Sequence, residues 1–167
     1  MQTFKQLFAA LTLSLLCSAP ASAESLVGRI ISIADGDTLI LLDAQQQQHK
    51  ISLAGIDAPE LNQAFGQQAL VSLSALALNQ SATAHCKPLE RFPHLICTLS
   101  IGGRDIGLAQ IQSGMAWWYR QNAAALGVQT QSDYRQAEFD AKIHRRGLWN
   151  NQNPTPPWDW RHGRIDD

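Results

Sequence analysis

Apolar and polar positions alternate along residues 26–54 in the way that β-strands require. Three strand-like runs occur there, V-G-R-I-I-S-I, T-L-I-L-L and K-I-S-L-A. A D-G-D turn separates the first two runs. A polar glutamine run at 45–48 separates the second from the third and predicts an exposed hairpin tip. The segment therefore predicts three strands with tight turns, which begin a small barrel.

Helical periodicity replaces this alternation further along the chain. Apolar residues recur at helical intervals between Phe65 and Leu78, a range without proline, so this range predicts a first helix. A short second helix is expected from Asp105, its N-cap, to Gln112. A third is expected from Ser132 to Arg146, where Gly147 stops it.

The order of these elements indicates the fold class. A strand pair is expected around Cys86 and Cys97, between the first and second helices. Strands, a helix, two more strands and two more helices fit a five-stranded Greek-key barrel with three packed helices, but the pattern alone reaches only an α+β fold that is partly a barrel. No internal repeat, linker or second domain is evident.

The N-terminus has the layout of a secretory signal peptide. Lys5 precedes an apolar run from Leu7 to Leu16, and A-S-A stands directly before Glu24. The apolar run is shorter than the ~20 residues of a membrane-spanning helix, which disfavours an anchor. We predict a signal peptide at 1–23, a domain at 24–150, a Pro- and Trp-rich tail at 151–167, and an exported protein, periplasmic or secreted, without a membrane span after cleavage.

Charge limits how this protein could bind nucleic acid. Removing residues 1–23 removes one of thirteen basic residues and none of fourteen acidic residues, so the formal charge falls from −1 to −2. The net charge therefore disfavours capture of nucleic acid by general positive charge, and binding would need a local patch. The candidates are Arg91, Arg104, Arg120, Lys142, Arg145 and Arg146, most of which are better interpreted as solvated surface charges.

Only Cys86 and Cys97 remain after processing. An even pair in an oxidising compartment indicates a disulfide, and two antiparallel strands could bring these cysteines opposite each other. A metal site with His85 and His94 is disfavoured, because neighbouring strand positions rarely give tetrahedral geometry.

Two carboxylates stand where strands begin and end. Asp37 lies in the turn before the second strand, and Asp57 lies where the third strand ends before Pro59. Hard oxygen donors that converge would suit calcium or magnesium. The alternative is that Asp35, Asp37 and the D-A-P-E segment only form turns and bind no ion.

The motifs D-G-D-T, L-A-G-I-D-A-P-E, G-M-A-W-W-Y-R and R-R-G-L-W resemble the staphylococcal nuclease (thermonuclease) family, over about Val27 to Trp160. The resemblance implies an OB-fold barrel and calcium bound by Asp37, Asp57 and the backbone carbonyl of Ala58. It also implies that Glu60 is the general base, or orients the attacking water.

The chain departs from the family at both catalytic arginines. Ser52 stands at one of these positions and His94 at the other. Lys50 projects to the same strand face as Ser52 but is a point charge rather than a bidentate fork. Further candidates for substrate binding are Arg91, Tyr119 and Arg120.

Three functions follow from this mixed set of residues. The leading hypothesis is a monomeric, calcium-dependent nuclease on DNA or RNA whose activity is weak or altered. The second is a catalytically inactive OB-fold module that binds single-stranded nucleic acid or another anionic polymer. The third is a protein-interaction module of the cell envelope. In the tail, Trp158 and Trp160 are expected to pack onto the domain beside Trp149, before the chain end frays.

Overall fold

The computed structural model describes residues 24–87 and 94–164. Five of the six strands of the main sheet have six or more residues: β1 Glu24–Ile33, β2 Thr38–Asp43, β3 Gln48–Leu53, β5 Ser81–Lys87 and β6 Leu95–Ile101. The three strands expected between residues 26 and 54 and the strand pair around the cysteines are therefore confirmed.

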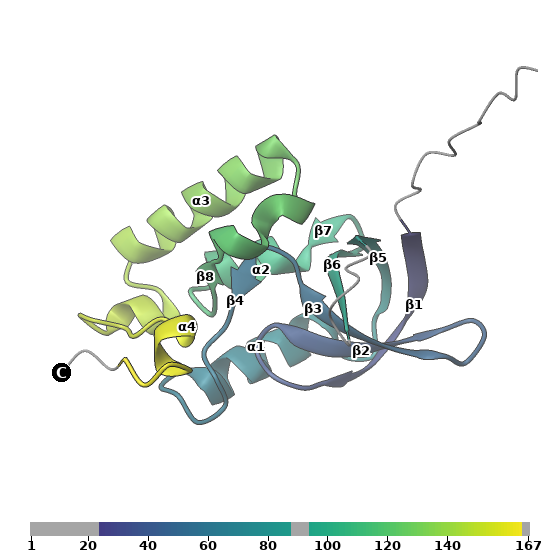
Figure 1. Ribbon diagram of the computed structural model, residues 1–167, viewed down its shortest axis with the longest axis horizontal. Coiled ribbons are helices and arrows are strands. Elements are labelled where there is room, and N and C mark those ends of the chain that lie inside the picture. The colour runs from purple at the N-terminus through teal and green to yellow at the C-terminus, as the bar shows by residue number, and fades with distance from the viewer. Residues whose placement is uncertain (1–23, 88–93, 165–167) are drawn as a thin grey trace, which may run out of the picture.

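These five strands close into a barrel. Their order is β3-β2-β1-β5-β6, and β3 also pairs with β6, in parallel, at Ser52↔Ile96 and Leu53↔Cys97. The alternating inward side chains are fully buried, among them Ile30, Leu39 and Ile51. The expected OB-fold α+β architecture is confirmed (Figure 1).

The helices are α1 Gly66–Ala77, α2 Ile106–Gln112, α3 Val128–Ile143 and a short α4 Pro157–Trp160, with 3-10 turns η1 Arg120–Ala125 and η2 Gly147–Asn150. The first two helices lie where the periodicity predicted them. The Asp105 side chain accepts a hydrogen bond from the Leu108 N–H, 3.0 Å away, so the expected N-cap is confirmed.

The predicted limits of the third helix were wrong at both ends. The helix starts at Val128, four residues earlier than expected, because the three residues after Val128 are polar and carry no apolar periodicity. It ends at Ile143 rather than Arg146. Arg145 adopts a left-handed conformation, with φ of 50°, which ends the helix before Gly147 is reached.

Three two-residue strands were not expected: β4 Ile56–Asp57, β7 Arg104–Asp105 and β8 Trp117–Trp118. Runs this short leave no alternation in the sequence. The β4–β8 pair matters because it aligns Asp57 with Trp117. The carboxylate expected at a strand end is therefore held by backbone pairing.

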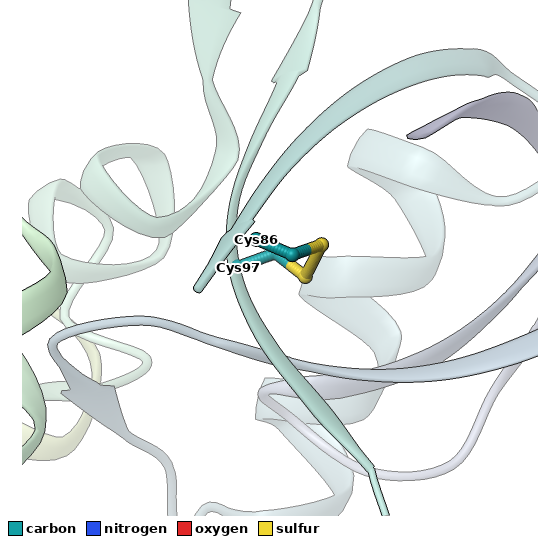
Figure 2. Close-up of a disulfide and its surroundings, with 2 residues drawn as sticks. All are labelled: Cys86 and Cys97. Carbon is teal, nitrogen blue, oxygen red and sulfur yellow. A yellow bond between two sulfur atoms is a disulfide. The ribbon is translucent and has the colours of Figure 1, made fainter. Parts of the chain in front are cut away.

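A disulfide joins Cys86 to Cys97, as predicted. The two residues are direct partners in the β5–β6 register, and their Cα atoms are 4.1 Å apart. Figure 2 shows the bond linking the two neighbouring strands. Because β6 also pairs with β3, the disulfide lies at the closure of the barrel.

The tail packs back onto the domain, as expected. Trp158 stacks on Tyr119 with 5.3 Å between ring centroids, and its ring lies 6.4 Å from that of Trp117. The Trp160 indole donates a hydrogen bond to the Asn62 side chain over 3.3 Å. Trp149 instead contacts Trp117, at 5.2 Å.

Several expectations concern other parts of the chain. The signal peptide at 1–23, Arg91 and the fraying chain end at 165–167 lie outside the described residues, and the boundary between domain and tail stays a prediction. Within the described residues, no helix combines the length and apolar character needed to cross a membrane.

Candidate active site

A cavity of about 180 Å³ opens at the end of the barrel where β2 and β3 meet the segment after β4. It brings together carboxylates, hydroxyls and cations from distant parts of the chain. Its lining residues are Asp35, Asp37, Thr38, Lys50, Ser52, Asp57, Ala58, Glu60, His94 and Arg161.

The turn before β2 fixes Asp37. Its backbone N–H donates to Asp35 Oδ1 over 3.0 Å, and its own carboxylate accepts from Thr38 Oγ1 at 2.9 Å and from the Ala58 N–H at 2.7 Å. Gly36 is required for this approach, because a Cβ there would lie 2.6 Å from the Ala58 side chain. The turn is thus held against the segment that carries Asp57.

Asp57 and Glu60 come from β4 and the turn that follows it. Asp57 is buried, at 6% exposure, and the Glu60 backbone N–H donates to Gln63 Oε1 over 3.1 Å. Gly66 allows the start of α1 to approach the Glu60 carbonyl so closely that a Cβ would collide with it. The path from β4 into α1 therefore places both carboxylates at one cavity.

Crowding of these carboxylates disfavours their charged forms. Burial raises the pKa of Asp37 well above its usual range, and the neighbouring charges of Asp35 and Asp57 raise it further. Burial also raises the pKa of Asp57, against the lowering effect of its hydrogen bonds with Arg161. A cation would relieve this repulsion.

The donor set fits a hard cation, since it consists of carboxylate and carbonyl oxygens. Among residues 24–87 and 94–164, no group of three or more His, Cys, Asp or Glu side chains has the geometry of a metal site. The calcium site that the resemblance implies uses only two such side chains, Asp37 and Asp57, together with one backbone carbonyl. The Arg161 guanidinium, a cation of the protein itself, forms an ion pair with Asp57.

Arg161 is the residue that sequence reasoning missed. Its guanidinium binds both Oδ atoms of Asp57, at 3.1 and 2.8 Å, and Glu60 Oε1 at 2.7 Å. It follows the anchored tryptophans in P-P-W-D-W-R, a signal that the tail is docked but not of where the arginine points. Figure 1 shows α4, in yellow, beside the segment after β4.

Lys50, one of the predicted substrate-binding residues, lines the same cavity, and so do Ser52 and His94, which stand at the family's arginine positions. Thr38 is paired with Ser52 and Ile40 with Lys50, and the hydroxyls of Thr38 and Ser52 are 3.2 Å apart. Lys50 and Ser52 therefore face the site together, as the period of the strand required.

Tyr119 and Arg120 do not line this cavity. The Tyr119 ring stacks on Trp158, and its hydroxyl donates to Gln121 over 2.9 Å. The guanidinium of Arg120 lies 4.8 Å from the ring centroid of Trp118. Their roles in substrate binding stay predictions.

Comparison with known protein families matches residues 50–151 to the family described as staphylococcal nuclease homologue. The chain belongs to this family. The match includes all of β3 except its first two residues, as well as Asp57, Glu60 and the helices around them, so the cavity lies mainly within the shared part of the chain.

Individual relatives extend the family match in both directions. The chain is 34% identical over 140 residues to an uncharacterized endonuclease of Haemophilus influenzae, which covers 84% of this chain and 75% of the relative. It is 34% identical over 156 residues to the micrococcal nuclease of Shigella flexneri, covering 88% and 86%. Protein ParB of Escherichia coli is 29% identical over 169 residues, covering 96% and 93%.

Proposed function

We propose that this nuclease homologue is an exported, monomeric, calcium-dependent phosphodiesterase that cleaves single-stranded nucleic acid. The observation that carries the proposal is the convergence of Asp37, Asp57 and Glu60 on one cavity, in a chain whose relatives are named endonuclease and micrococcal nuclease. The disulfide supports export, because such bonds persist in oxidising compartments.

Asp37, Asp57 and the Ala58 carbonyl would hold the calcium ion. When bound, calcium supplies positive charge that offsets the negative charge developing on the phosphoryl oxygens. Glu60 lies at the edge of the cavity, with its side chain 36% exposed, so a water molecule can reach it. Glu60 orients this water and accepts its proton as the water oxygen bonds to phosphorus; the P–O bond to the leaving oxygen breaks, and that oxygen takes a proton from solvent.

Activity should be lower than in a relative that has both family arginines. Neither Ser52 nor His94 carries a guanidinium, and a well-placed arginine is worth roughly 10³ to 10⁵ in rate in related phosphoryl chemistry. This same loss supports the second candidate, an inactive barrel that binds single strands without cleaving them.

The deciding experiment is digestion of single-stranded DNA by the purified exported protein, with calcium and with a chelator. We expect calcium-dependent cleavage that the Asp57→Ala control, prepared in the same way, lacks; this control detects a contaminating nuclease. Saturable binding of DNA without cleavage would replace the nuclease proposal with the binding module.

Calcium binding has an independent measure. Because a ligand of the native state raises apparent stability, millimolar calcium should raise the melting temperature. A variant with both Asp37→Ala and Asp57→Ala should lose this shift. An equal shift in the variant would place the metal elsewhere.

A further inference from the structure

The cavity contains a guanidinium, although neither expected strand position supplies one. Ser52 and His94 line the cavity together with Arg161, which comes from the chain segment after α4. Arg161 is separated from Asp57 by 104 positions in the sequence. The guanidinium that these two positions lack is thus supplied by the tail.

The contacts of Arg161 leave part of its binding capacity unused. A guanidinium has five N–H donors. Three are used in the hydrogen bonds to the two Asp57 oxygens and to Glu60, so within residues 24–87 and 94–164 two remain for a further acceptor. The side chain is 43% exposed and lines the cavity, so solvent reaches it there.

The tail that carries Arg161 is tied to the segment that carries Glu60. Gln63 is buried, at 8% exposure; its Oε1 accepts from the Glu60 N–H and its Nε2 donates to the Thr155 carbonyl. Trp160 is hydrogen-bonded to Asn62, next to Gln63. One buried amide therefore fixes the distance between the proposed base and the docked tail.

Resting on the proposed function, we propose that Arg161 binds the substrate phosphate, in place of the arginines missing at Ser52 and His94. A guanidinium fork matches the geometry of phosphate oxygens, and arginine is charged at every physiological pH. Asp57 and Glu60 orient the guanidinium, and its remaining donors meet the phosphate beside the proposed calcium ligands. A phosphodiester is the ligand class whose anionic oxygens fit both a guanidinium and a cation site.

The test separates binding from cleavage by using the Glu60→Gln background, in which an amide oxygen still accepts from Arg161. Affinity for a fluorescent single-stranded DNA oligonucleotide is measured by anisotropy with calcium, over a range of salt concentrations. Adding Arg161→Gln should weaken binding about tenfold or more. It should also lower the slope of log affinity against log salt by about 0.7, the value for one lost phosphate contact on a single strand.

Two further variants isolate the guanidinium. Arg161→Lys keeps the charge but not the fork, so its affinity should lie between those of the other two proteins. Arg164→Gln is the matched control: this tail arginine is 71% exposed, lies 3.5 Å from Asp159 and does not line the cavity. It should leave affinity and salt slope nearly unchanged. Equal unfolding midpoints among the variants would show that folding is intact.

The opposite role, a plug that blocks the cavity, gives the opposite result. If Arg161→Gln binds DNA as well as or better than the Glu60→Gln parent, or cleaves faster in the otherwise unaltered protein, the proposal is overturned. Absence of calcium-dependent oligonucleotide binding by the Arg161-containing protein overturns it as well. A protein that binds DNA through Arg161 but does not cleave it would reject the proposed hydrolysis alone.

Discussion

The two halves of the candidate site are built differently. In the barrel half, residues 35–60, a buried strand end and tight turns hold Asp37 and Asp57 through backbone pairing and local hydrogen bonds. In the tail half, residues 155–161, a four-residue helix is held by a few side-chain contacts and by aromatic stacking. The anions thus come from the barrel and the turns beside it, and the guanidinium comes from the docked tail.

The largest effect should come from the barrel half. Glu60→Gln removes the proposed base but keeps the shape of the side chain, so calcium-dependent cleavage of single-stranded DNA should fall by about 10² to 10⁴. Calcium affinity serves as the control and should change little by comparison. A cleavage rate within about twofold of the parent would place the base elsewhere, since this is far below the usual contribution.

The disulfide tests how far the barrel half depends on closure of the sheet. Replacing Cys86 and Cys97 together by alanine should lower the free energy of unfolding by about 2 to 3 kcal/mol, because the closed loop is short. Urea unfolding measures this loss. Mass spectrometry of the native, unreduced protein should find no free thiol at either position, and two free thiols would refute the pairing.

Undocking the tail should reproduce the loss of its arginine. Trp158→Ala removes the ring that stacks on Tyr119, so we expect cleavage to fall by about tenfold, as for the loss of one charged hydrogen-bonding group. Phe139→Ala removes another aromatic side chain, 56% exposed on α3, and is the matched control. Equal rates for both variants would show that stacking does not position Arg161.

The smallest effect concerns two carboxylates with opposite shifts. The pKa of Asp37 is raised, so the folded state binds this proton more tightly than the unfolded state, and stability is lost as pH rises through the raised pKa. Asp37→Asn should therefore stabilise the calcium-free protein at neutral pH by on the order of 1 kcal/mol. The gain should shrink as the pH falls and Asp37 becomes protonated.

Asp43 is the comparison. Its hydrogen bond with His49, and then that with the Gln47 N–H, lower its pKa, so its contribution to stability is present above the unfolded pKa of about 3.9 and is lost as pH falls below it. Asp43→Asn should therefore lower the melting temperature at neutral pH. Melting curves between pH 3 and 8 measure both variants. The same sign for the two would contradict this account of the site's repulsion.

The sequence predicted the barrel half because its parts are neighbours along the chain. Asp37 and Asp57 stand where turns and strand ends are visible as D-G-D and D-A-P-E, and the strand period placed Lys50 and Ser52 on one face. Arg161 could not be predicted in the same way. No periodicity or turn signal relates a residue to a partner 104 positions away.

The smaller errors have two different causes. The first residue of helix α3, Val128, is followed by three polar residues, so its start carries no apolar pattern, and the left-handed Arg145 ends it without glycine or proline. The β4–β8 pair has two residues in each strand, and only the folded chain brings them together. A long-range contact, rather than a local preference, determines this pair.

The central claim is that the tail supplies the guanidinium that the barrel has lost. Its most direct test is the rate of calcium-dependent cleavage of single-stranded DNA by four proteins: the parent, Arg161→Gln, the pair Ser52→Arg with His94→Arg, and all three changes together. We expect Arg161→Gln to reduce the rate, and the two strand-side arginines to restore it by at least about tenfold, well within the effect of one such group. Glu60→Gln should abolish the restored rate. If Arg161→Gln cleaves as fast as the parent and the added arginines restore nothing, the claim is contradicted.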